Sequence, residues 1–428
     1  MNASAGLVGR LVDLLKVPLP QAEAAQARLV LADTVGCMIG GLADDEVAAL
    51  RSRLPLGAKT EGATGVRHAP ADTAMLLGFA AAAQELDEGH YDAGGHPAAP
   101  VAAAILAETS GASAFDDRVI RAFVLGYEAA ARGGHAIRLR TDIHPHGTWG
   151  AVGAAVAVAS LRNMPTSMWP DVVDMAASLA TPTSFATPLL GGTVRSALIG
   201  VSARNGMLAC DLVLAGVGSG PGSLERNLGG ILGTGCDRNL LVPAAPTPPM
   251  LMSNFMKLEA SCRETQGALT ALDAALDGRE TKPSDIRTIQ IETFEAAQLL
   301  DCTSPTNATA ARFSTPAVLA ARLLQGHIRP DSFSADLLTS ESFLHLASTV
   351  AFVPVARDGP VSRHCRVVVT YSDGTAISGQ TDHCPGDPEA PFSRSTLKQK
   401  FLSLTRCSGR PDSAALWRQI CGEETPET

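Results

Sequence analysis

The spacing of apolar and polar positions divides the 428-residue chain into two regions. From residue 5 to about 240, apolar residues recur every three or four positions, as on the buried face of a helix. We predict helices in this region over 22–39, 72–83, 101–108, 116–132, 150–161, 170–180 and 194–215. Gly and Pro residues lie in the connections, where they end helices. The first region is therefore predicted to be all-α.

The pattern changes after a segment of four prolines within residues 242–250, a composition typical of a crossing between domains. Beyond it we predict helices over 262–277, 312–325 and 394–421, and strands over 286–294, 366–370 and 375–378. The strands are indicated by alternating apolar and polar positions, and the last two flank the hairpin turn sequence Ser372-Asp373-Gly374. The second region is therefore predicted to be α+β, with a return to helix near the C-terminus.

The composition narrows the choice of core and of partners. Hydrophobic residues make up 46% of the chain but aromatic residues only 4%, so the core must be built from Ala, Leu and Val. Small side chains allow helices to pack closely against one another. The net charge is −9 and no run of Lys or Arg occurs, so we expect neither nucleic acid nor an anionic membrane as a partner.

Cysteine usage and the apolar segments bear on localisation. The nine Cys are dispersed without a C-x-x-C motif, which is typical of reduced thiols in a cytosolic protein. We find no basic-then-apolar signal pattern at the N-terminus, and apolar segments such as 149–161 are too short to span a bilayer. We expect a cytoplasmic protein.

One segment concentrates side chains that can transfer protons. Within twelve residues it contains Glu85, Asp87, Glu88, His90, Asp92 and His96. A helix rich in Ala follows at once, entered through Pro97 and Pro100. Acids and imidazoles at this density on a loop before a rigid helix are typical of proton-transfer sites. The alternative is a solvated acidic loop that caps the helix.

A second candidate segment, His144 to Gly150, precedes the predicted helix over 150–161 and contains His144, His146 and Thr148. The positive end of a helix dipole lowers the pKa of an imidazole and keeps it neutral, which suits a base or a neutral hydrogen-bond donor. The alternative is that these residues only cap the helix.

Two cations are candidates for binding a carboxylate. Arg195 lies at the start of the predicted helix over 194–215, where its guanidinium is suited to bidentate contact with a carboxylate. Its alternative is an ordinary surface salt bridge. Lys257 is one of only six Lys in the chain, and its alternative is a side chain that lies along the surface with its head in water. His90 and His96 form only a weak metal pattern, so we predict no metal site.

These segments occur in an ordered series with several others. The series is Ala32-Asp33-Thr34, Glu85-Leu-Asp-Glu-Gly89 with His96-Pro97, His144-Pro-His-Gly-Thr148, Val194-Arg195, Lys257 with Cys262-Arg263, Ala311-Arg-Phe-Ser-Thr-Pro316, and Pro385-Gly-Asp-Pro388. The series resembles the MmgE/PrpD family over essentially the whole chain. The resemblance implies an all-α domain, 1–250 and 388–428, interrupted by an α+β lid domain, 251–387. It also implies a homodimer, no metal or organic cofactor, and an active site in the cleft between the domains.

The resemblance further implies carbon-acid chemistry on a small di- or tricarboxylate. By position in the family motifs, the catalytic residues would be His96, His144, Glu85 and Asp87, and the substrate-binding residues Arg195, Lys257, His146 and Thr148. One of the two catalytic imidazoles would move the proton, and Glu85 or Asp87 would orient it. Gly89, Gln266 and Ala317 depart from the residues common in the family.

We predict a cofactor-free lyase of the dehydratase type that removes a proton α to a carboxylate in a substrate such as 2-methylcitrate. The absence of an aromatic residue at position 317 argues against the decarboxylase activity known in the family. One alternative is an epimerase or isomerase of a small dicarboxylate resembling iminodisuccinate. The other is a carboxylate-binding protein without catalytic activity.

Overall fold

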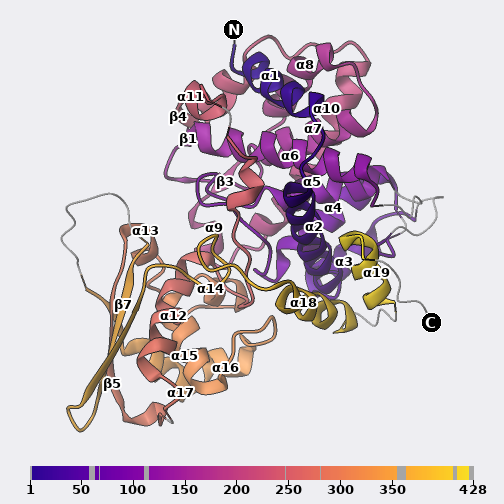
Figure 1. Cartoon of the computed structure of the whole chain (residues 1–428). Helices are drawn as coiled ribbons and strands as arrows, with labels where there is room; N and C mark the ends of the chain where they lie inside the picture. The colour runs from indigo at the N-terminus through magenta and orange to yellow at the C-terminus, as the bar shows by residue number, and fades with distance from the viewer. Residues whose placement is uncertain are drawn as a thin grey trace. The chain divides into compact units, whose positions relative to one another are not determined.

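The computed structural model describes residues 2–56, 63–66, 68–109, 115–245, 247–279, 281–353, 363–407 and 412–423, and it is mainly α-helical with small sheets (Figure 1). The chain forms two compact units. The first consists of Met1–Phe185, Val194–Met256 and Phe392–Thr428, and the second of Ala186–Thr193 and Lys257–Pro391. The proposed crossing over 242–250 includes Pro246, and the predicted helix over 394–421 includes 408–411; both lie outside the described residues.

Seven helix ranges predicted before residue 240 are each confirmed to within four residues at either end, and the first unit is built mainly from these helices and from others that were not predicted. They are α1 (Ala3–Lys16), α2 (Gln21–Gly41), α3 (Asp45–Arg53), α4 (Pro70–Ala83), α5 (Ala98–Glu108), α6 (Asp117–Ala136), α7 (Gly150–Leu161), α8 (Trp169–Ser178), α10 (Val194–Leu214), α11 (Arg238–Leu241), α18 (Arg394–Cys407) and α19 (Ser413–Cys421), with the 3₁₀ turns Thr166–Met168 and Met250–Ser253 and a π-helix over Leu224–Ile231. Most of their buried side chains belong to Ala, Leu and Val, as the composition predicts.

The prediction of an all-α first region is wrong in one respect. The unit contains two short antiparallel strand pairs, β1 (Ile137–Leu139) with β4 (Gly233–Cys236), and β2 (Ile143–His144) with β3 (Thr183–Ser184). A strand of two to four residues is too short to show an alternating pattern, so periodicity could not detect it. The pair β2–β3 contains His144, one of the residues predicted for the site.

Close helix packing is clearest where α4 crosses α10. A Cβ atom added to Gly200 of α10 would lie 2.0 Å from the carbonyl oxygen of Met75 in α4, and one added to Gly78 would lie 2.5 Å from the Cα of Gly200. Only glycine permits these two backbones to touch. Helix α10 is also long and apolar enough to cross a membrane by length and composition, a test that buried core helices meet as well.

The second unit combines a sheet with short helices. Its elements are α9 (Ala186–Leu189), α12 (Arg263–Leu276), the 3₁₀ turn Pro283–Asp285, β5 (Ile286–Glu292), α13 (Glu295–Gln298), α14 (Ala308–Arg312), α15 (Thr315–Gln325), α16 (Ala335–Thr339), α17 (Glu341–Ser348), β6 (Val350–Phe352), β7 (Cys365–Tyr371) and β8 (Ala376–Thr381). The strands form a sheet in the order β6-β5-β7-β8. In Figure 1 the helices α12, α15 and α17 lie along one side of β5 and β7.

The predicted hairpin is confirmed, and the sheet contains one strand that was not predicted. Strands β7 and β8 are antiparallel around the turn at Ser372-Asp373-Gly374, where Gly374 has a φ of 89° that favours glycine. Strand β6 pairs in parallel with β5, with Ile289 opposite Val350, and was not predicted. The helix predicted over 312–325 corresponds to α15, which begins three residues later because the hydroxyl of Ser314 accepts from the N–H of Ala317 and caps it; the short α14 before it was not predicted.

Candidate active site

The segment between α4 and α5 lies inside the first unit and is not a solvated loop. Glu85, Asp87 and Glu88 are 3%, 1% and 1% exposed, whereas Asp92 at the turn is exposed. Buried carboxylates are strongly disfavoured unless they are paired or hydrogen-bonded. The solvated-loop interpretation of residues 85–96 is therefore wrong, and each buried acid is expected to have a partner.

Glu85 forms an ion pair with Arg195, the second residue of α10. Arg195 is 2% exposed, so the interpretation of this residue as part of a surface salt bridge is wrong. Glu85 also has a φ of 55°, in the left-handed region that residues other than glycine rarely adopt. Strained backbone of this kind costs on the order of 1–3 kcal/mol and persists where the surroundings fix it. Here the ion pair with Arg195 is one such constraint.

His96 has one ring nitrogen fixed by the loop and one directed at Arg195. Its Nδ1 lies 2.6 Å from the carbonyl oxygen of Glu88 and 3.1 Å from Oδ2 of Asp87. Both neighbours are acceptors, so Nδ1 carries the proton and Nε2 carries a lone pair. Nε2 lies 3.5 Å from Nη2 of Arg195. The side chain of His96 is 12% exposed, more than its partners Asp87 and Arg195, so this ring is the one most accessible to a small molecule.

His146 has the same proton position as His96 and faces the same guanidinium nitrogen. Its Nδ1 donates to the carbonyl oxygen of Arg195 at 3.0 Å, and its Nε2 lies 3.4 Å from Nη2 of the same residue. The rings of His96 and His146 are 5.2 Å apart and nearly perpendicular, at 82°. One guanidinium nitrogen therefore faces the unprotonated nitrogens of two imidazoles.

His144 has the opposite proton position. Its Nδ1 accepts from the backbone N–H of His146 at 3.1 Å, so the neutral ring carries its proton on Nε2. Burial, with His96 as the second cause, lowers the pKa of His144 to about 3. The imidazole of His144 is therefore neutral, as predicted, but the cause is burial and not a helix dipole. His144 lies in β2, and α7 begins only at Gly150.

Thr148 and Lys257 complete the predicted set. The hydroxyl of Thr148 donates to the carbonyl oxygen of Pro145 at 2.6 Å and is fully buried, so it shapes the turn before α7. Lys257 belongs to the second unit and is also fully buried, so the interpretation of this residue as a surface-lying side chain is wrong. The structure thus brings together Glu85, Asp87, His96, His144, His146 and Arg195 within the first unit.

Glu88 supports this group and was not assigned a role from the sequence. Its carboxylate accepts from the hydroxyl of Tyr127 at 2.5 Å and from the N–H of Ala98 at 3.1 Å, while its own carbonyl holds His96. Burial raises the pKa of Glu88 to about 8, with a smaller contribution from Asp87, although the two hydrogen bonds act in the opposite direction. This residue joins the loop to the first turn of α5 and to α6.

Lys400 of α18 is a second support that the sequence analysis missed. Its Nζ donates to Asp33 of α2 at 2.7 Å and to the carbonyl oxygen of Leu86 at 2.7 Å. Burial alone would lower the pKa of Lys400, but the Asp33 carboxylate raises it above its ordinary value. An acid inside the apolar run around residue 33, in a chain with few Lys, was the available signal; the partner was not identifiable from spacing.

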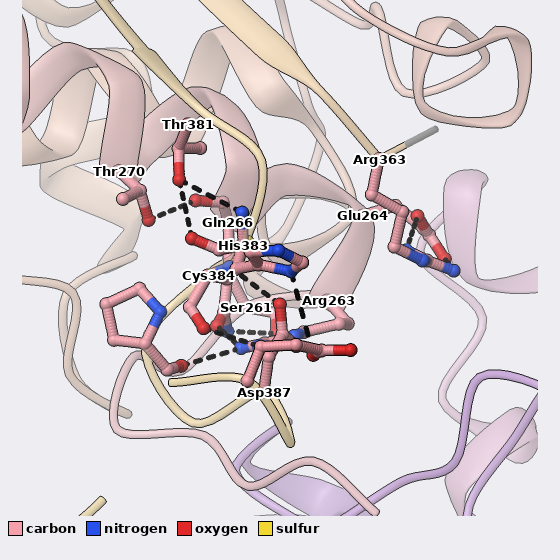
Figure 2. A network of polar contacts seen from close by, with 12 residues as sticks. Ser261, Arg263, Glu264, Gln266, Thr270, Arg363, Thr381, His383, Cys384 and Asp387 are labelled. Atoms are coloured by element: carbon pink, nitrogen blue, oxygen red, sulfur yellow. Dashed lines mark hydrogen bonds and ion pairs between the residues drawn. The ribbon is translucent and has the colours of Figure 1, made fainter. Parts of the chain in front are cut away.

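In the second unit, the segment that follows Lys257 is held by a polar network (Figure 2). Arg263 forms an ion pair with Asp387 and donates to Oε1 of Gln266 at 2.7 Å. The amide nitrogen of Gln266 donates in turn to the carbonyl oxygens of Glu259, at 3.1 Å, and Ser261, at 3.3 Å. Gln266 is therefore occupied in fixing residues 259–263.

Among the described residues, one group has the composition and proximity of metal ligands, namely His383, Asp387 and Glu389 of the second unit. Its buried member, Asp387, already accepts from Arg263 and from the N–H of Cys384. His383 and Glu389 are exposed. A divalent cation would have to lie beside the guanidinium of Arg263, so we assign no metal to this group.

Comparison with known proteins covers almost the whole chain. The family model for the MmgE/PrpD N-terminal domain matches residues 12–237, and that for the MmgE/PrpD C-terminal domain matches residues 260–421. A protein described as cis-aconitate decarboxylase from Aspergillus terreus is 25% identical over 444 aligned positions, covering 94% of this chain and 90% of the relative. A second protein with this description, from A. terreus strain NIH 2624 / FGSC A1156, is 24% identical over the same span.

Proposed function

Because the chain belongs to the MmgE/PrpD family, we propose that it is a lyase that removes a proton α to a carboxylate of a small di- or tricarboxylate. The observation that carries this proposal is the arrangement around His96. Its accessible ring has an unprotonated Nε2, backed by Asp87 on the other nitrogen and placed beside the buried guanidinium of Arg195. A base next to a fixed cation is what carbanion formation requires, because the charge that develops must be stabilised.

We assign the roles from the proton positions. His96 takes the α-proton on Nε2, and Asp87 together with the carbonyl of Glu88 stabilises the imidazolium that results. Arg195 stabilises the negative charge that moves onto the substrate carboxylate. His144, neutral with its proton on Nε2, serves as a hydrogen-bond donor rather than as the base.

In the dehydratase reaction, the C–H bond breaks towards His96, the electron pair forms the double bond, and the β-hydroxyl leaves. The imidazolium of His96 returns its proton to this hydroxyl, so the products are an unsaturated carboxylate and water. A 2-methylcitrate-like substrate suits this reaction because it carries a hydroxyl β to an acidic C–H. Binding of substrate by Lys257, His146 and Thr148 stays a prediction, as do the homodimer and the independence from cofactors.

Decarboxylation is the second candidate, favoured by the two relatives described as cis-aconitate decarboxylase. Proton NMR in deuterated water with citrate, 2-methylcitrate, cis-aconitate and iminodisuccinate separates the candidates. A new vinyl proton from citrate, or a new signal for a methyl group on a double bond from 2-methylcitrate, supports dehydration, and replacement of the single vinyl proton of cis-aconitate by the signals of a product with one carboxylate fewer supports decarboxylation. Exchange of α-hydrogen for deuterium without a new double bond supports an epimerase. No change in any compound refutes the proposal.

The role of Asp87 is tested by Asp87→Asn. The amide still fills the space but no longer stabilises the imidazolium, so kcat should fall by about 10²- to 10⁴-fold with little change in KM. Asp92→Asn, an exposed acid of the same loop, is the matched control and should keep wild-type kcat. An unchanged kcat in Asp87→Asn would contradict the role of Asp87 in stabilising the imidazolium of His96.

A further inference from the structure

Gly89 is a glycine because of space rather than backbone conformation. Its φ is not among the positive values of the described glycines, so other residues could adopt its backbone angles. A Cβ atom added to it, however, would lie 2.4 Å from Cζ and 2.8 Å from Cε2 of Phe255. The ring of Phe255 therefore occupies the volume that a side chain at position 89 would take.

Phe255 is held firmly in this place. Its N–H donates to the carbonyl oxygen of Gly89 at 2.8 Å and its carbonyl oxygen accepts from the N–H of Gly89 at 3.0 Å. The preceding turn is tied down as well, because Nε2 of His90 lies 3.0 Å from the carbonyl oxygen of Met250 and 3.1 Å from Oγ of Ser253. Phe255 is 4% exposed, so its ring has little freedom to move away.

The ring also borders the proposed base. The ring centroids of Phe255 and His96 are 6.5 Å apart with the planes at 81°, and those of Tyr91 and Phe255 are 4.7 Å apart. The side of His96 that faces Phe255 is therefore lined by hydrocarbon. A hydroxyl or carboxylate placed there would lose its hydrogen bonds to water without replacement, whereas an alkyl group would not.

We infer that Phe255, seated on Gly89 and flanked by Tyr91, determines specificity by favouring a substrate with an alkyl group next to the reacting carbon. This inference rests on the proposed function, since it assumes that substrate reacts at His96. It adds the residue that would select an alkyl-substituted polycarboxylate over its unsubstituted counterpart. Transfer of one methyl group from water to hydrocarbon favours binding by about fourfold.

Competition between side chains at positions 89 and 255 for the same volume is tested first by measuring stability in urea. Gly89→Ala should lower the urea midpoint, because the new Cβ overlaps the ring of Phe255. Phe255→Ala should lower it as well, by leaving a cavity. In the double variant the methyl group at position 89 enters vacated space, so the loss should be clearly smaller than the combined losses of the two single variants. Additive losses would show that the two positions do not share this volume and would overturn the inference.

Specificity is tested by binding of citrate and 2-methylcitrate, which differ by one methyl group, to the Asp87→Asn protein, whose turnover is slow. Calorimetry should give an affinity for 2-methylcitrate at least about fourfold above that for citrate. Adding Phe255→Ala should reduce this preference to near one, and adding Phe255→Leu, the milder change, should reduce it while preserving the fold. Adding Tyr91→Phe, which keeps the ring, should leave the preference unchanged.

The outcomes separate this inference from the proposed function. Equal affinity for the two ligands, or a preference that survives Phe255→Leu and Phe255→Ala in folded protein, overturns the role of Phe255 and leaves a carboxylate-binding lyase intact. Failure of the parent protein to bind either compound refutes the proposed substrate class, and the inference falls with it.

Discussion

Replacement of Glu88 by Gln should change the pH dependence of stability. The free energy of unfolding of the variant should increase relative to that of the wild type as the pH rises. Glu88 is buried and its pKa is raised from 4.5 to about 8. Between these values the folded protein keeps the proton while the unfolded chain releases it. Because the unfolded state binds fewer protons, the free energy of unfolding contributed by Glu88 falls as the pH rises. Each pH unit in this window corresponds to about 1.4 kcal/mol, and the whole window to about 5 kcal/mol.

Gln cannot ionise, so Glu88→Gln avoids this loss. Its amide changes the hydrogen bonds with Tyr127 and Ala98, but that cost is nearly independent of pH and cancels when the two proteins are compared across pH. Urea unfolding at pH 5, 6, 7 and 8 should therefore show the variant gaining about 1.4 kcal/mol per pH unit over the wild type.

Tryptophan fluorescence suits this measurement because Trp149, Trp169 and Trp417 all lie in the first unit. Glu46→Gln is the matched control, since Glu46 is an exposed glutamate of the same unit. The free energy of unfolding of Glu46→Gln should differ from that of the wild type by less than about 1 kcal/mol at every pH. A constant difference between Glu88→Gln and the wild type over pH 5–8 would refute the assignment of a raised pKa to Glu88.

Two further predictions concern packing around the site. Lys400→Met should cost about 3–5 kcal/mol in urea unfolding because it leaves the buried Asp33 without its cation; the control Lys398→Met, on the same helix, should cost less than about 1 kcal/mol, and equal losses would contradict the support role of Lys400. Gly200→Ala should lower the melting temperature by overlap with α4, at a cost of about 1–3 kcal/mol. Gly218→Ala, where a Cβ meets open space, is its control; a Gly200→Ala protein as stable as this control would show that α4 and α10 tolerate a side chain between them.

Most helices of the first unit were predictable because they are long segments rich in Ala, Leu and Val between connections that contain Gly and Pro, although α5 and α7 are buried on every side rather than along one face. The predicted range 150–161 coincides with α7, and 194–215 with α10 to within one residue. The strands β1 to β4 were not predictable, since each has too few residues to show a period. The start of α15 was placed three residues early because Ser314 was not recognised as its N-cap.

In the candidate site, too, some features could be predicted from the sequence and others could not. The residues that it brings together were found because His96, His144 and Arg195 lie in dense or family-like motifs. The proton positions were not predictable, because they depend on the carbonyls of Glu88 and Arg195, which any residue could supply. Lys400 was out of reach for a related reason, since its partner Asp33 is 367 residues away in the sequence.

The distance in sequence between Asp33 and Lys400 determines the order in which the parts of the site can form during synthesis. Asp33 and Leu86 leave the ribosome early, but the ammonium group that joins them belongs to α18, and all of Lys257–Pro391 is synthesised in between. Domains generally fold as units during synthesis, so we expect the second unit to be complete while the first still lacks its last helices. The loop that carries His96 therefore acquires its support from Lys400 only after the whole second unit has been synthesised.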